Sequence, residues 1–192
     1  MSLVLSVCKI ICIFVGRNKL YIVNGKLYMA KRIGLLSDTH SHWDERYAKH
    51  FAECDEIWHV GDIGTLEIAD KLRAVAPLRA VHGNIDGTDI RREFPEIQRF
   101  MCEDVDVLMK HIGGYPGKYD RSIFHELMTN PPKLFISGHS HILKVMMDKR
   151  LGCLHINPGA AGVYGQQPVR TLIRFVIDGE TIKDLEIIEL KE

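Results

Sequence analysis

The stretch KRIGLLSDTH, residues 31–40, decides the class of fold. Its apolar first part is typical of a buried strand, and the apolar run ends abruptly at the polar residue Asp38. The same plan returns at residues 56–62, 78–84 and 133–141, where a short apolar run ends in glycine and a polar side chain. Helix-like segments separate the early runs, which predicts parallel strands joined by helical crossovers.

The rest of the chain also alternates between strand and helix patterns. We expect strands at residues 31–37, 56–60, 78–82, 97–101, 105–111, 133–137, 143–148, 154–157, 171–177 and 181–189, and helices at 43–54, 66–75 and 122–130. Strands separated by helices early in the chain, followed by strands that meander, predict an α/β fold with two mixed sheets and helices outside.

Residues 1–28 are interpreted as an extension of a domain that spans residues 29–192. Residues 3–15 are largely apolar, but they are fewer than the ~20 that a membrane-spanning helix needs. β-Branched runs broken at residues 16–18 and 24–25 predict a two- or three-stranded ribbon. A natural start at Met29 stays open, and so does a homo-oligomer that packs through the apolar ribbon.

Charge and cysteine usage limit the choice of partners and compartment. Lys and Arg number 25 and Asp and Glu number 25, so the formal net charge is zero. This balance argues against a protein that grips nucleic acid without sequence preference, and we expect neither a stable nucleic-acid partner nor a membrane. The five cysteines are scattered and include no C-x-x-C pair. They indicate free thiols in a reducing compartment, and we expect a cytoplasmic protein.

Side chains that bind metals follow the ends of several predicted strands. They are Asp38, His40, Asp62, Asn84, His111, His139 and His141. The intervals from 38 to 62, 62 to 84, 84 to 111 and 111 to 139 are 24, 22, 27 and 28 residues. Each is about the length of a strand, a crossover and the next strand. Because the carboxyl ends of parallel strands meet at one edge, we expect all seven side chains to lie together.

The donor types indicate the chemistry of this predicted site. Carboxylate, amide and imidazole donors without thiolate suit manganese, iron, zinc or nickel better than calcium or magnesium. Seven donors exceed the needs of one tetrahedral ion, so two ions that share a carboxylate are the simplest interpretation. Such a pair assists in-line displacement at phosphorus. Taken singly, Gly-Asp and Gly-Asn are ordinary turn dipeptides; their joint occurrence carries the prediction.

The order of these motifs resembles the calcineurin-like metallophosphoesterase superfamily over about residues 31–190. The motifs are Asp38-x-His40, Gly61-Asp62, Gly83-Asn84-x-Asp86, His111 and Gly138-His139-x-His141. The short length and Asn157-Pro158-Gly159 are similar to the small bacterial phosphodiesterases. The resemblance implies a four-layer α/β/β/α sandwich and two metal ions, usually manganese. It assigns Asp38, His40, Asp62 and His141 to the first ion, and Asp62, Asn84, His111 and His139 to the second.

The function that this resemblance implies is a dinuclear, metal-dependent phosphodiesterase. A metal-bridging hydroxide would attack a small phosphodiester in line, with Asp62 and Asn84 as catalytic residues. His82, at a strand end, is a further candidate for contact with the phosphate. Ile85 stands where many members carry histidine, which favours leaving groups of low pKa. The alternatives are a phosphomonoesterase, or a non-catalytic scaffold of the same fold that resembles a retromer subunit.

Other residues are expected to support or border the site. His59 is interpreted as a buried neighbour that orients Asp62, and Asp86 as a residue that orients its own loop. Residues 113–117 are expected to form a mobile loop or a wide turn beside the metals. The aromatic rim of the pocket is predicted to come from Trp43, Tyr115 and Tyr119.

Overall fold

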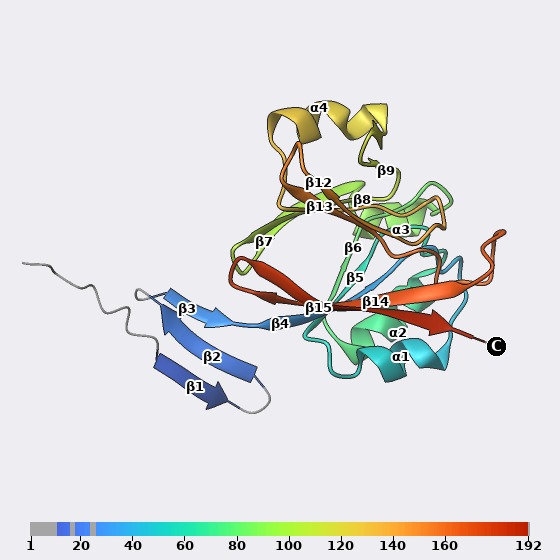
Figure 1. The fold of residues 1–192 in the computed structure, drawn as a ribbon. Coiled ribbons are helices and arrows are strands. Elements are labelled where there is room, and N and C mark those ends of the chain that lie inside the picture. Colours follow the sequence, from blue (N-terminus) through green and yellow to red (C-terminus); the bar gives the residue numbers. More distant parts are fainter. Residues whose placement is uncertain (1–10, 16–17, 24–25, 192) are drawn as a thin grey trace, which may run out of the picture.

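Two five-stranded sheets lie face to face at the centre of the molecule (Figure 1). The computed structural model describes residues 11–15, 18–23 and 26–191. The first sheet has the order β15-β14-β4-β5-β6, with bounds Thr181–Leu190, Arg170–Asp178, Lys31–Leu36, Glu56–His59 and Leu78–Ala80. The second has the order β12-β13-β11-β8-β7, with bounds Lys144–Asp148, Cys153–Asn157, Leu134–Ile136, Val105–Lys110 and Ile97–Cys102. Both sheets contain parallel and antiparallel pairs, which confirms the predicted mixed sheets.

Helices cover the outer faces of both sheets, so the sandwich has four layers (Figure 1). Helices α1 (Glu45–Phe51) and α2 (Leu66–Val75) pack on the first sheet through Tyr47, Phe51, Ile68 and Leu72. Helix α4 (Arg121–Thr129) packs on the second sheet through Ile123 and Leu127. The cluster between the sheets includes Ile33, Leu35, Trp58, Val107, Met109, Leu134 and Ile136. This is the α/β/β/α arrangement that the sequence predicted.

Strand β4 shows why the apolar runs form this sandwich. All of its last four residues are buried because both faces of the sheet are covered. Ile33 and Leu35 point between the sheets, whereas Leu36 packs with α1 and α2. Helix α1 is shorter than the predicted helix over residues 43–54. It begins after Asp44, whose carboxylate accepts a hydrogen bond from the Arg46 backbone N–H at 3.0 Å.

A short helix and a short hairpin beside the predicted site were not expected from the sequence. Helix α3 (Thr88–Glu93) has only six residues, too few to show a helical period. Strands β9 (Gly114–Tyr115) and β10 (Lys118–Tyr119) pair antiparallel. They form a small hairpin where we expected a mobile loop or a wide turn. The Gly113 carbonyl oxygen accepts a hydrogen bond from the Asp120 backbone N–H at 3.0 Å, which closes the base of the hairpin.

The first strands of the chain form a separate sheet. Strands β1 (Ile11–Val15), β2 (Asn18–Val23) and β3 (Lys26–Met29) are antiparallel and follow each other in chain order. Residues 3–10, 16–17 and 24–25 of the predicted ribbon lie outside the described residues, and the division of the chain at residue 28 stays a prediction. Among the described residues, no helix has the length and apolar character needed to cross a membrane.

Candidate metal centre

The predicted metal-binding residues occupy loops at one edge of the two sheets. Asp38 and His40 follow β4, Asp62 follows β5, Asn84 follows β6, His111 follows β8, and His139 and His141 follow β11. Backbone hydrogen bonds connect these loops directly. Asp38 N–H donates to the Gly61 carbonyl at 3.0 Å, and Gly138 N–H donates to the His111 carbonyl at 2.9 Å. Within each sheet, parallel strands bring their loops to the same edge. The face-to-face packing of the two sheets then brings the two sets of loops together.

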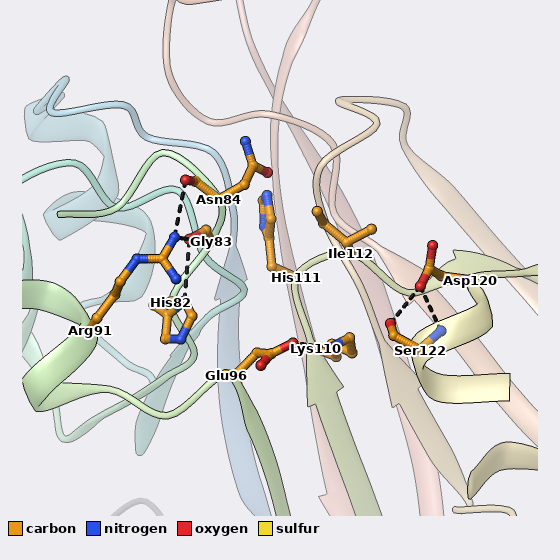
Figure 2. A pocket seen from close by; sticks show the side chains of 10 residues that line it. All are labelled: His82, Gly83, Asn84, Arg91, Glu96, Lys110, His111, Ile112, Asp120 and Ser122. Carbon is orange, nitrogen blue, oxygen red and sulfur yellow. Dashed lines mark hydrogen bonds and ion pairs between the residues drawn. The ribbon is translucent and has the colours of Figure 1, made fainter. Parts of the chain in front are cut away.

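Six of the seven side chains form two adjoining groups. Asp38, His40 and His141 are the first group, and Asp62, His111 and His139 are the second. Within each group the donor atoms all lie within 4.8 Å of one another. In the first group, His141 Nε2 is 3.2 Å from Asp38 Oδ1. In the second, His111 Nε2 is 3.2 Å from Asp62 Oδ2. Asn84 lines the same cavity as His111, on the side of the second group (Figure 2).

The two carboxylates face both groups. Asp62 Oδ2 is 3.9 Å from His40 Nε2 in the first group, as well as 3.2 Å from His111. Asp38 Oδ1 is likewise 3.9 Å from His111 Nε2. The Asp62 Oδ1 atom accepts a hydrogen bond from the Ile85 backbone N–H at 3.0 Å, which leaves Oδ2 directed at the imidazoles. One carboxylate could therefore serve two cations.

Backbone strain is concentrated at these residues. Asp38, His40, Asp62, His139 and His141 all have positive φ, between 46° and 66°. This region is uncommon for residues other than glycine, and it persists where the surrounding structure holds the backbone in place. Such strain is typical of functional sites. Here it marks five of the seven residues that the sequence had selected independently.

A main-chain carbonyl sets the protonation of His111. Its Nδ1 lies 2.7 Å from the Val60 carbonyl oxygen, which can only accept, so Nδ1 carries the hydrogen. The lone pair is then on Nε2, on the side of Asp62 and Asp38. Burial disfavours the charged imidazole, but the neighbouring carboxylates of Asp62 and Asp38 prevail and raise the pKa of His111. The ring therefore sits in a negative field that favours a cation.

Two buried polar atoms indicate that the donor set fits metal ions. Asp38 Oδ1 and His111 Nε2 are both buried and make no hydrogen bond of good geometry, although His141 Nε2 and Asp62 Oδ2 lie 3.2 Å from them. A buried polar atom without a partner costs about 1–3 kcal/mol, so native structures rarely leave one. A divalent cation between such a carboxylate and such an imidazole would satisfy both atoms. The mixed nitrogen and oxygen donors suit a transition-metal ion.

Two residues hold the site loops in register. His59 Nδ1 accepts from the Gly61 backbone N–H at 3.2 Å, and His59 Nε2 lies 2.9 Å from Thr39 Oγ1. Burial lowers the pKa of His59 to about 4, so the ring is neutral. Asp86 accepts from the Gly64 and Gly83 backbone N–H groups, both at 2.7 Å. His59 thus supports the residue next to Asp62, and Asp86 joins its own loop to the Asp62 loop.

A cavity of about 680 Å³ is lined by both His139 and His141, and two further cavities adjoin the second group. One, of about 380 Å³, is lined by His82, Asn84, Arg91, Glu96, Lys110 and His111 (Figure 2). The other, of about 590 Å³, is lined by His139 together with Tyr115, Tyr119, Lys144 and His155. Both also include Ile112 and Asp120, which therefore stand between them. His82 lies in the cavity of about 380 Å³ but outside the two metal-binding groups.

The predicted aromatic rim is correct only in part. Tyr115 and Tyr119 line the cavity of about 590 Å³. Trp43 lines none of these cavities; its ring packs edge-on against Tyr47, and its Nε1 donates to Glu45 at 2.8 Å. Trp43 precedes the cap of α1, and the apolar cluster beneath that helix draws its ring away from the site.

Sequence reasoning missed two residues that contact the site loops. Arg91, on α3, donates to the carbonyl oxygens of Gly83, Asn84 and Asp86 at 2.9, 3.1 and 2.7 Å. Gln167 Oε1 lies 3.0 Å from His141 Nδ1. No local pattern marks either residue. Arg91 lies on a helix too short to detect, and Gln167 lies in a loop 26 residues beyond its partner.

Comparisons with known proteins found a matching family model and similar proteins. A model of the calcineurin-like phosphoesterase superfamily domain matches residues 32–180. A probable metallophosphoesterase of Methanothermobacter thermautotrophicus is 30% identical over 164 residues, which cover 81% of this chain and 91% of that protein.

Solved structures share the fold at lower identity. One described as a novel archaeal phosphodiesterase has a TM-score of 0.63 at 22% identity, and the match covers 83% of this chain and 99% of that one. Vacuolar Protein Sorting 29 of Cryptosporidium parvum has a TM-score of 0.66 at 16% identity, and the match covers 85% and 99%. These structures show the likeness of fold.

Proposed function

Because the chain belongs to the calcineurin-like phosphoesterase superfamily, we propose that it is a dinuclear, metal-dependent phosphodiesterase. The observation that carries this proposal is the pair of adjoining groups, Asp38, His40 and His141 beside Asp62, His111 and His139. Asp38 Oδ1 and His111 Nε2, two buried atoms that make no hydrogen bond of good geometry, further support a centre built for cations.

Each group has a defined part in this proposal. The first group would hold one ion, and the second group, together with Asn84, would hold the other. Two divalent ions, when bound, supply the Lewis acidity that activates water and stabilises charge on the phosphoryl oxygens. The Asp62 carboxylate is fixed by the Ile85 backbone N–H, so that its second oxygen faces both groups. Among the metals that suit these donors we favour manganese, with zinc, iron and nickel as alternatives.

The surroundings of the second group favour a diester over a monoester. A diester carries two organic substituents, and two of the cavities that adjoin this group share Ile112 and Asp120 in their linings. Ile85 supplies no proton donor for the leaving group, which favours small diesters with leaving groups of low pKa. His82 lines the cavity of about 380 Å³ beside His111, and it is the candidate there for contact with a phosphate oxygen, because His111 belongs to the second group.

The test is hydrolysis of bis(p-nitrophenyl) phosphate and of p-nitrophenyl phosphate by protein stripped with a chelator and then supplied with Mn²⁺. We expect manganese-dependent cleavage of the diester, with slower cleavage of the monoester. Asp62→Asn should lower diester cleavage by at least 100-fold, because it replaces the carboxylate that faces both groups with a neutral amide. Asp70→Asn is the matched control, since Asp70 lies exposed on α2.

Three results would contradict the proposal. Uptake of metal without cleavage of either ester would rule out the broad phosphodiesterase that we propose. Failure to bind metal at all would favour the non-catalytic scaffold. That alternative draws on the fold shared with Vacuolar Protein Sorting 29, although the likeness at 16% identity concerns the fold alone. Faster cleavage of the monoester would identify a phosphomonoesterase.

A further inference from the structure

The amide of Gln167 has one orientation only. Its Nε2 donates hydrogen bonds to the carbonyl oxygens of Gly162 at 3.1 Å and Tyr164 at 2.9 Å. Because carbonyl oxygens can only accept, the NH₂ group must face them. The amide oxygen Oε1 is therefore the atom that lies 3.0 Å from His141 Nδ1.

This orientation decides which nitrogen of His141 carries the hydrogen. An amide oxygen accepts a hydrogen bond, so Nδ1 must be protonated, and the lone pair of the neutral ring is left on Nε2. That atom is 3.2 Å from Asp38 Oδ1 and 3.3 Å from His40 Nε2. The contact with Gln167 thus directs the metal-binding nitrogen of His141 into the first group.

The segment that carries Gln167 is packed tightly against the first group. The Gly162 backbone N–H donates to the Asp38 carbonyl at 3.0 Å, and the Tyr164 ring lies 5.5 Å from that of His40. Gly165 has a φ of 116°, and a Cβ atom there would lie 2.3 Å from Gln167 Oε1. Only glycine leaves room for the amide to reach His141. The second group differs, because a main-chain carbonyl orients its His111.

We propose that Gln167 is a positioning residue for the first metal-binding group, acting through the tautomer and ring orientation of His141. This inference rests on the metal-binding residues of the proposed function. It predicts a selective effect: loss of the Gln167 acceptor weakens the first group and spares the second. Mutation of a residue that hydrogen-bonds a metal-binding histidine typically lowers metal affinity by 10- to 100-fold.

The experiment titrates Mn²⁺ into chelator-stripped protein and follows heat and bound metal per chain. The variant Gln167→Met keeps the length of the side chain but removes both the acceptor and the donors to Gly162 and Tyr164. Gln167→Glu removes the donors but keeps an acceptor toward His141, so it separates the two losses. We expect two ions per chain in the unaltered protein, and one tight ion plus one bound at least 10-fold more weakly in Gln167→Met. Gln167→Glu should restore tight binding of both ions. Gln166→Met, a change at the exposed neighbouring residue, should change nothing.

A second readout tests the positioning without metal. In ¹⁵N-histidine-labelled, metal-free protein, His141 should show the Nδ1-protonated tautomer, and Gln167→Met should lose that preference while thermal unfolding confirms that it is folded. If Gln167→Met keeps both the tautomer and two tight ions, or loses both ions equally, the inference is wrong although the proposed function stands. If the unaltered protein binds no Mn²⁺, the proposed function fails, and the tautomer still decides the role of Gln167.

Discussion

The backbone of Ile85 and its side chain have different surroundings. The backbone N–H holds the Asp62 carboxylate, while the side chain is 48% exposed beside the site. A new side chain at this position can therefore act on a substrate without disturbing the loop. This makes residue 85 the place to test the leaving-group preference.

Ile85→His should broaden the range of esters that the protein cleaves. A histidine there adds a proton donor, and general acids contribute about 10²–10⁴-fold when the leaving group is poor. We expect the ratio of activity on an alkyl ester to activity on a p-nitrophenyl ester to rise at least tenfold. Ile85→Ala, which adds no donor, should leave the ratio as it is. An unchanged ratio in Ile85→His would refute our account of this position.

Glu56, far from the metal-binding groups, provides a pH-dependent part of the stability. Burial alone would raise its pKa, but hydrogen bonds from Arg79, Lys31 and Trp58 prevail and lower the pKa from 4.5 to about 2. The carboxylate lies 2.7 Å from both Arg79 Nε and Lys31 Nζ. A lowered pKa in the folded state stabilises the protein above pH 4.5, and this contribution is lost as pH falls toward 2.

Glu56→Gln should cost about 2 kcal/mol of unfolding free energy at neutral pH, after allowance for solvent around Lys31 and Arg79. The cost should shrink between pH 4.5 and pH 2, because the unaltered protein loses the ion pairs there. Urea unfolding of both proteins across this window measures the effect. Glu67→Gln, at an exposed position, is the control. A cost that is independent of pH would show that the ion pairs contribute nothing.

At the scale of elements, the contact between β4 and α1 sets the distance between the first sheet and its covering helix. A Cβ atom on Gly34 would lie 2.6 Å from the Phe51 ring, inside van der Waals contact. The sheet and the helix can approach this closely because position 34 has no side chain. The same strand then leads directly into the loop with Asp38 and His40.

Gly34→Ala should therefore destabilise the fold by about 1–3 kcal/mol, the usual cost of overpacking a core. The measurement is the midpoint of urea unfolding. Gly87→Ala is a matched control, because nothing lies within 4 Å of a Cβ there and its φ of −75° suits alanine. Equal effects of the two substitutions would show that the Phe51 contact is easily relaxed.

At the scale of the whole molecule, the candidate metal centre joins loops from both sheets. Asp38 and Asp62 come from the first sheet, and His111 and His139 from the second. Ions that bind all four would hold the sandwich together at this edge. The two sheets otherwise meet through the apolar cluster between them.

Removal of metal should lower the thermal unfolding temperature, and Mn²⁺ should restore it. A ligand at 100 times its dissociation constant stabilises the folded state by about 2.7 kcal/mol. Ca²⁺, which prefers oxygen ligands, should restore much less than Mn²⁺. Calorimetry of stripped and reloaded protein measures both. If Mn²⁺ leaves the unfolding temperature unchanged, the two groups do not bind it in the folded state.

The sequence alone determined the layers and the set of candidate ligands. Short apolar runs and glycine at strand ends are local signals. With the helix-like segments between them, they predicted every strand of the two large sheets and three of the four helices in the described part of the chain. The intervals between Asp38, Asp62, Asn84, His111 and His139 were also readable. Each interval is about the number of residues in a strand, a crossover and the next strand, and this number can be counted directly in the sequence.

Only the tertiary structure decided how the candidate ligands are oriented. His111 depends on a carbonyl 51 residues away, and His141 on an amide 26 residues away. Such contacts follow from the path of the loops and leave no local period in the sequence. Trp43 illustrates the same limit, because its ring joins the apolar cluster beneath α1 and not the predicted rim. Periodic elements are set by interactions between near neighbours, whereas loop geometry is set by packing between distant segments.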